Sequence, residues 1–177
     1  MRDVALELGK AGAAGTEEGV RPVLRDGVVV ATLRASIWKE AATAVVEDRE
    51  WVLAKDGREL VGRWPVDPAG TARLRARQTS WWRGTWDVDL EGLVLQAARA
   101  SLWRSALRYT DGDRQVALGG TTGGWSPRPT LTADVPLPLH QQVFLLWVES
   151  VLARREAGAG GVDGGGDGGG DGGGGGD

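Results

Sequence analysis

Turn-forming pairs divide the middle of this sequence into segments that are too short for helices. Asp-Gly pairs stand at 26–27, 56–57 and 111–112, and a Glu-Gly pair stands at 91–92. Asp-Gly supplies the positive φ angles that tight β-hairpins need. Short segments rich in Val, Leu, Thr and Trp, with a turn about every 8–12 residues, are typical of an all-β sandwich or barrel of antiparallel neighbours. The predicted strands are 28–34, 42–47, 50–54, 59–66, 71–78, 85–89, 92–98, 106–110 and 114–118.

Helix-forming residues follow the last of these segments and predict one helix near the C-terminus. The prolines at 136 and 138 end the preceding strand, and we expect the helix from about residue 138 to 156. Its residues 143–148, VFLLWV, are all apolar, so they cover every side of the helix instead of one stripe. Because a helix that is apolar all round is normally buried, we expect this one to fill the inside of the β structure.

The chain divides into three zones. Residues 1–19 are mostly Gly, Ala and Glu without a period and predict a flexible N-terminal arm. Residues 20–157 carry nearly all of the large apolar side chains, so they form the single folded domain. Residues 158–177 are almost entirely Gly and Asp and have nothing to bury, which predicts a disordered tail.

One phrase occurs twice. RASIWK at 34–39 returns as RASLWR at 99–104, and the longer stretch 26–39 aligns without a gap to 91–104. The repeat predicts that one hairpin unit is used twice, in two halves of the same domain. In this interpretation each phrase ends a strand, turns, and folds its tryptophan onto the core. The alternative is chance similarity between strands rich in Trp and Arg.

Composition excludes several classes of function. The chain has no cysteine, so a disulfide, a thiolate zinc site and a cysteine nucleophile are impossible, and a reducing compartment is favoured. The net charge is −3, and the tail supplies Asp163, Asp167, Asp171 and Asp177, so the folded part is close to neutral. Nucleic-acid binders usually have a strong basic excess, and we expect no nucleic acid as a partner. The apolar run 143–148 is far shorter than the roughly 20 residues of a spanning helix, and the N-terminus has no apolar run typical of a signal peptide.

Candidate catalytic residues are few. The one histidine, His140, falls in the expected first turn of the helix, and no G-x-S-x-G context or metal-ligand spacing accompanies it. Asp87 and Asp89 share one face of a strand, which favours a solvated surface over acid–base chemistry. The glycine-rich run 119–124 could present N–H groups to an anion, but it lacks the Lys-Ser/Thr ending of a P-loop. We predict a wide loop or a bulge between strands there, and no catalytic residue, cofactor or metal.

Arginines form the most suggestive surface. Arg73, Arg75 and Arg77 alternate along one predicted strand, so their guanidinium groups project on the same side. Arg83 follows within the tryptophan-rich stretch 81–86. Guanidinium recognises phosphate through its planar fork, and tryptophan favours the membrane–water boundary. We therefore predict these four arginines as ligands of an anionic headgroup; the alternative is an ordinary exposed strand whose arginines pair with nearby acids.

The chain has nine tryptophans. Trp38, Trp51 and Trp64 are spaced 13 residues apart, one in each successive strand region. Hairpins that each seat one ring against a central helix would give this spacing, so we predict core packing. Stacking of sugars or bases is the alternative, and it requires exposed rings.

Several phrases resemble the tubby C-terminal-like superfamily, in particular its small bacterial members related to the plant LURP-one proteins and to phospholipid scramblases. They are the D-G-x-V-x-A-x-x-R pattern at Asp26–Arg34, the two R-A-S-x-W phrases, the run Asp56–Gly62 and the closing FLLWVESVL, and they span residues 20 to 156. The resemblance implies a mainly β fold, a closed antiparallel barrel of about 12 strands around a buried hydrophobic C-terminal α-helix, which leaves no free sheet edge. The cysteine cluster and proline-rich arm of scramblases are missing.

These observations predict a non-enzymatic binding module that docks on anionic phospholipid headgroups or on an acidic protein partner. Two alternatives stay open: an enzyme or small-ligand carrier with a site inside the barrel, and a scramblase-like lipid-handling protein. We expect a cytoplasmic location, peripheral to a membrane. The sequence predicts no oligomeric state.

Overall fold

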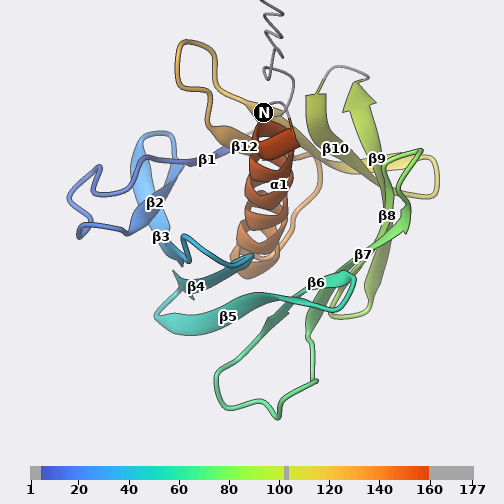
Figure 1. The fold of residues 1–177 in the computed structure, drawn as a ribbon, viewed down its shortest axis with the longest axis horizontal. Helices are drawn as coiled ribbons and strands as arrows, with labels where there is room; N and C mark the ends of the chain where they lie inside the picture. Colours follow the sequence, from blue (N-terminus) through green and yellow to red (C-terminus); the bar gives the residue numbers. More distant parts are fainter. Residues whose placement is uncertain (1–4, 102–103, 160–177) are drawn as a thin grey trace, which may run out of the picture.

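The structure is a computed structural model, and it describes residues 5–101 and 104–159. Twelve antiparallel strands close into a barrel, and one helix, α1, follows the last strand (Figure 1). The elements are β1 (Leu6–Leu8), β2 (Arg21–Arg25), β3 (Val28–Ala35), β4 (Ala41–Val46), β5 (Arg49–Asp56), β6 (Glu59–Arg63), β7 (Leu74–Ser80), β8 (Thr85–Leu90), β9 (Leu93–Ser101), β10 (Arg104–Asp111), β11 (Arg114–Thr121), β12 (Pro129–Ala133) and α1 (Leu139–Ala159). The predicted mainly β class and closed barrel are confirmed.

Strand β1 closes the ring. It pairs antiparallel with β2 on one side and with β12 on the other. Leu6 and Leu8 are fully buried, and Glu7 between them is not, which is the alternation of a strand with one face inward. The expected flexible arm over residues 1–19 is therefore corrected, because residues 6–8 complete the barrel. A strand of three residues gives too short a pattern to stand out among Gly and Ala.

The interior of the barrel is apolar. Along β4, for example, Ala42, Ala44 and Val46 are buried, while the residues between them are more exposed. Every strand contributes buried side chains to one core cluster that also contains the middle of α1. Burying apolar area in this way gives about 25 cal/mol per Å², so the common core stabilises barrel and helix together.

Helix α1 lies within the ring of strands, as Figure 1 shows. Phe144, Leu145 and Trp147 are at most 1% exposed, which confirms the prediction of a buried hydrophobic C-terminal helix. The helix contacts strands around the whole ring, namely β1, β4, β7, β10, β11 and β12. In the described part of the chain, no helix is long and apolar enough to cross a membrane.

The repeated phrase does not occupy equivalent places. It falls on β3 and β9, which stand on opposite sides of the barrel. In β3 the register with β2 shifts at Val30, an extra residue that forms a bulge, whereas the pairing of β8 with β9 is regular. Since a shift of one residue turns each side chain to the other face, the 65-residue alignment sets buried Leu33 against exposed Ala98. The sequence similarity is thus not kept in the packing.

The barrel has two ends, which α1 distinguishes. Because neighbouring strands are antiparallel, successive connections alternate between the ends. We call the end where α1 begins the entry end and the end where it finishes the exit end. The entry end carries loops 26–27, 47–48, 64–73, 91–92, 112–113 and 134–138. The exit end carries loops 9–20, 36–40, 57–58, 81–84 and 122–128.

Candidate functional site

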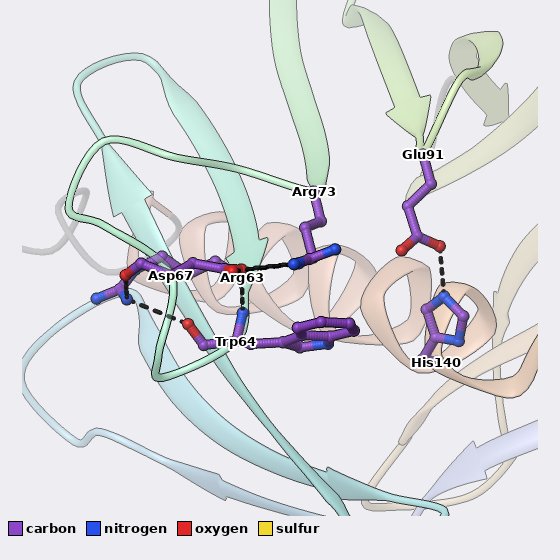
Figure 2. A network of polar contacts seen from close by, with 6 residues as sticks. All are labelled: Arg63, Trp64, Asp67, Arg73, Glu91 and His140. Carbon is purple, nitrogen blue, oxygen red and sulfur yellow. Dashed lines mark hydrogen bonds and ion pairs between the residues drawn. The ribbon is translucent and has the colours of Figure 1, made fainter.

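His140 is held in a polar contact at the entry end, as Figure 2 shows. Its Nε2 lies 2.6 Å from Oε2 of Glu91, and its ring stacks on Trp51 with the centroids 4.9 Å apart. Burial raises the pKa of Glu91, but hydrogen bonds from His140 and Gln141 outweigh burial, so the pKa is lowered. Since these contacts tie the first turn of α1 to the β8–β9 turn, they explain His140 as a structural residue.

Arg73 belongs to the same end and is held in place by its neighbours. Its guanidinium lies 3.4 Å from the ring centroid of Trp64 and donates to both carboxylate oxygens of Asp67 at 2.7 and 3.0 Å. The side chain of Asp67 also accepts the N–H of Trp64, and Arg63 donates to the carbonyl oxygens of Trp64 and Asp67 (Figure 2). Arg49 covers the same tryptophan ring at 4.2 Å. Arg73 therefore closes the 64–73 loop.

Arg75 and Arg77 project outward from β7, and the residues between and before them are buried, as the alternation predicts. Arg75 forms an ion pair with Glu59 at 2.8 Å. In the backbone register of β7 with the neighbouring strand β8, Asp89 stands opposite Arg75 and Asp87 stands opposite Arg77. Acidic and basic side chains therefore alternate on this face. This is the arrangement expected of an ordinary exposed strand, not of a basic stripe.

Arg83 lies at the other end of the barrel from Arg73. It is exposed in loop 81–84 at the exit end, whereas Arg73 lies at the entry end. The four predicted arginines therefore do not form one surface.

The glycine-rich run 119–124 is only partly a loop. Gly119, Gly120 and Thr121 continue β11 and pair with β12, and the loop begins at Thr122. A glycine-rich run favours a loop by composition, but here the ladder with β12 extends the strand.

The tryptophans divide between core and surface. Trp51, Trp86 and Trp147 are buried and Trp64 is partly buried. By contrast Trp38 is 91% exposed, Trp82 is 89% exposed, Trp81 is 70% exposed, and Trp125 is fully exposed. Trp103 lies outside the described residues. The prediction of core packing holds for Trp51, and it is wrong for Trp38, which stands in a loop and not on a strand.

The exposed tryptophans gather at the exit end. Trp38 lies in loop 36–40, Trp81 and Trp82 in loop 81–84, and Trp125 in loop 122–128. We call these four residues the tryptophan rim. Odd-to-even hairpins of an antiparallel ring all turn at the same end, so tryptophans far apart in sequence are brought to one end. The sequence indicated the stretch 81–86 with Arg83 as part of a headgroup surface, but not that Trp38 and Trp125 lie at the same end, although each of the three loops also contains Gly or Ser and a basic residue.

Charge differs between the two ends. The exit-end loops contain the bases Lys10, Lys39, Arg58, Arg83 and Arg128 and the acids Glu17, Glu18 and Glu40. The entry-end loops contain the acids Asp26, Glu47, Asp48, Asp67, Glu91, Asp113 and Asp134 and the base Arg73. Of the exit-end acids, Glu40 is bound by both Arg155 and Lys55. In the loops, acids therefore outnumber bases at the entry end, and bases outnumber acids at the exit end, where the tryptophan rim also lies.

A recess of about 490 Å³ lies beside Trp81 and Trp82 at the exit end. Trp86, Arg99 and the end of α1 also line it. Arg99 crosses directly over Gly84, where a Cβ atom would come within 2.7 Å of the Arg99 Nε. The recess thus sets a guanidinium beside two exposed indole rings.

No cluster of three or more possible metal ligands exists among the described residues. Comparison of the chain with family models, with curated proteins and with solved structures found no match.

Proposed function

We propose that this protein is a non-enzymatic binding module that docks on anionic phospholipid surfaces with its tryptophan rim. The observation that supports this most is that four exposed indole rings share one end of the barrel with the basic loops, while the acids gather at the other end. An anionic surface would attract the exit end and repel the entry end, so charge alone would orient the molecule.

The chemistry of the rim matches a lipid–water boundary. An indole ring has an apolar body and a polar N–H, and for this reason tryptophan is enriched at membrane interfaces. Lys39, Arg58 and Arg83 are exposed on the same end. Each base near an anionic leaflet contributes about 1 kcal/mol, so three contribute about 3 kcal/mol.

The shape of the rim favours a lipid surface over an acidic protein. The tryptophans stand on three separate loops, whereas the core of a protein–protein interface is one closely packed patch. Separate loops at one end of the barrel can each enter a fluid surface without a matching partner shape. The resemblance to tubby-like proteins agrees with such a role and is part of the proposal.

The ligand residues in this proposal differ from those that the sequence predicts. Arg83 is kept, because it is exposed beside Trp82. Arg73 and Arg75 are replaced by the tryptophan rim, because their guanidinium groups are bound by Asp67 and Glu59. Within residues 5–101 and 104–159, no specific side-chain arrangement favours an enzymatic function or lipid scrambling.

Cosedimentation with vesicles tests this function. We expect the protein to sediment with phosphatidylcholine vesicles containing phosphatidylserine, and less so as salt is added, since screening weakens surface charge interactions. Replacement of all four rim tryptophans by alanine should reduce the bound fraction at least tenfold.

The matched control replaces Val28, Val66 and Val94 by serine, since these are exposed apolar residues outside the rim. This control should bind like the wild type. Equal binding by the rim variant and the wild type would contradict the proposal. Wild-type protein that ignores vesicles but binds polyglutamate would point to an acidic protein instead.

A further inference from the structure

A second cavity, of about 570 Å³, also lies beside α1, and Glu156 lines both this cavity and the recess. It runs between α1 and the wall made by β11, β12 and loop 122–128. Ala157, near the finish of α1, lines it together with Glu149, which is eight residues earlier. At 1.5 Å per residue these two positions are about 12 Å apart along the helix, so the cavity reaches from the exit end well into the barrel.

Small residues on both sides make the room. Ala153 and Ala157 face the cavity from α1, and Gly120 faces it from the wall. Positions 149, 153 and 157 are four residues apart, so they lie on one face of the helix. The middle of α1 has large apolar side chains on every side, but this face changes to alanine after Glu149. The barrel is therefore filled at its middle and open along this face.

Glu149 forms the floor of the cavity. Glu149 is only 4% exposed. Its Oε1 accepts hydrogen bonds from the Tyr109 hydroxyl at 2.7 Å and from the Leu107 N–H at 3.2 Å. On its other side the carboxyl lies against Gly119, where a Cβ would be 2.3 Å from the carboxyl carbon. Only glycine at 119 leaves the carboxyl this position.

The hydrogen bonds of Glu149 are concentrated on one of its two carboxyl oxygens. Both donors point at Oε1, while Oε2 has only a long contact of 3.4 Å with the same Leu107 N–H. Among the described side chains, Tyr109 of β10 donates to the Glu149 carboxyl, Glu156 of α1 lines the same cavity, and no Lys, Arg or His lines it. A buried carboxylate without a positive partner is costly.

We propose that this cavity binds a primary ammonium group carried on a short apolar stem, with Glu149 as its counter-ion. The ammonium would donate to Oε2 of Glu149, and the stem would lie against Ala153, Ala157 and Gly120. An anion is disfavoured, since Glu149 and Glu156 would repel it. A divalent metal is disfavoured because it takes several oxygen ligands, whereas the lining otherwise consists mainly of Ala, Gly, Thr and Pro. The inference is independent of the proposed docking on membranes.

Two sources of this chemistry exist, a free amine and the headgroup of an aminophospholipid. Isothermal titration calorimetry distinguishes them with n-butylammonium chloride and with monomeric dihexanoylphosphatidylethanolamine. n-Butanol, which has the same butyl chain without the charge, is the uncharged control for n-butylammonium. We expect at least one amine to bind, and n-butanol to bind at least tenfold more weakly.

Two variants assign the site. Glu149→Gln keeps the shape and removes the charge, so it should weaken amine binding at least tenfold. Ala153→Leu leaves Glu149 in place and fills the cavity, so it should abolish binding, with a circular dichroism spectrum like that of the wild type. The tighter of the two amines identifies the source. Absence of binding by both amines, or binding that survives Glu149→Gln, would overturn the proposal.

Discussion

Replacement of Trp147 by alanine should lower the free energy of unfolding by about 3–5 kcal/mol, the cost typical of removing a large aromatic side chain from a core. Trp147 is fully buried, its ring centroid is 6.0 Å from that of Phe144, and it belongs to the core cluster shared by barrel and helix. Its loss would leave a cavity on the axis of the barrel that the closed ring of strands cannot collapse to fill. Urea unfolding followed by far-ultraviolet circular dichroism measures the change.

Trp82→Ala provides the control for this prediction. The residue type is the same, but Trp82 is 89% exposed, so the change in unfolding free energy should stay within about 0.5 kcal/mol. If Trp147→Ala proved as mild as Trp82→Ala, α1 would not lie inside the barrel.

Glu149→Gln should remove a pH dependence from the stability of the protein. Burial raises the pKa of Glu149 to about 7, although hydrogen bonds from Tyr109 and Leu107 lower it in part. Burial and the charge of Glu149 raise the pKa of Tyr109 well above its usual value, so this hydroxyl remains a donor. The carboxyl is therefore the group that titrates.

The folded chain holds the proton of Glu149 more tightly than the unfolded chain does. Below pH 4.5 the carboxyl is protonated in both the folded and the unfolded chain. Between pH 4.5 and about 7 only the folded chain keeps the proton, so stability falls as the pH rises through this window. Each pKa unit corresponds to about 1.4 kcal/mol, so the total loss is about 3 kcal/mol at most.

The difference in unfolding free energy between Glu149→Gln and the wild type isolates this effect from other carboxyl groups. It should shift in favour of the variant by up to about 3 kcal/mol between pH 4.5 and pH 8. Glu50→Gln, at an exposed position, should show no such trend. A difference that is constant with pH would mean that Glu149 is not a desolvated acid.

Local sequence signals were sufficient for much of the fold. Asp-Gly and Glu-Gly mark turns at 26–27 and 91–92, and the residues found there, Asp26, Gly27, Glu91 and Gly92, all have positive φ. The run 143–148, which is apolar on every side of the helix, predicts that the helix lies inside the barrel. Such signals act over a few residues, so they can be read along the chain.

Features set by pairing between distant segments could not be predicted. β1 and β12 are short and lie far apart in sequence, and they become strands because they close the ring on each other. The bulge at Val30 is likewise a property of the β2–β3 pair. For this reason the ungapped repeat of 26–39 at 91–104 predicts equivalent packing, but β3 and β9 pack differently.

The gathering of the exposed tryptophans at one end could not be predicted for a related reason. Alternation correctly placed Arg75 and Arg77 outside, but the acids beside them come from β6 and β8. Whether a tryptophan is core or surface depends on whether it stands on a strand, as Trp51 and Trp86 do, or in a loop, as Trp38 and Trp82 do. Trp82 beside Arg83 and Gly84 had the composition of an exposed turn.

The most direct test of the proposed function is to ask which end of the barrel meets a lipid surface. The chain has no cysteine, so Trp82→Cys and Asp113→Cys can each carry one environment-sensitive nitrobenzoxadiazole label, at the exit and entry ends. With vesicles containing phosphatidylserine, we expect the emission of the label at 82 to shift to the blue and to brighten, and that of the label at 113 to stay unchanged. An unchanged label at 82, or an equal shift at 113, would contradict docking through the tryptophan rim.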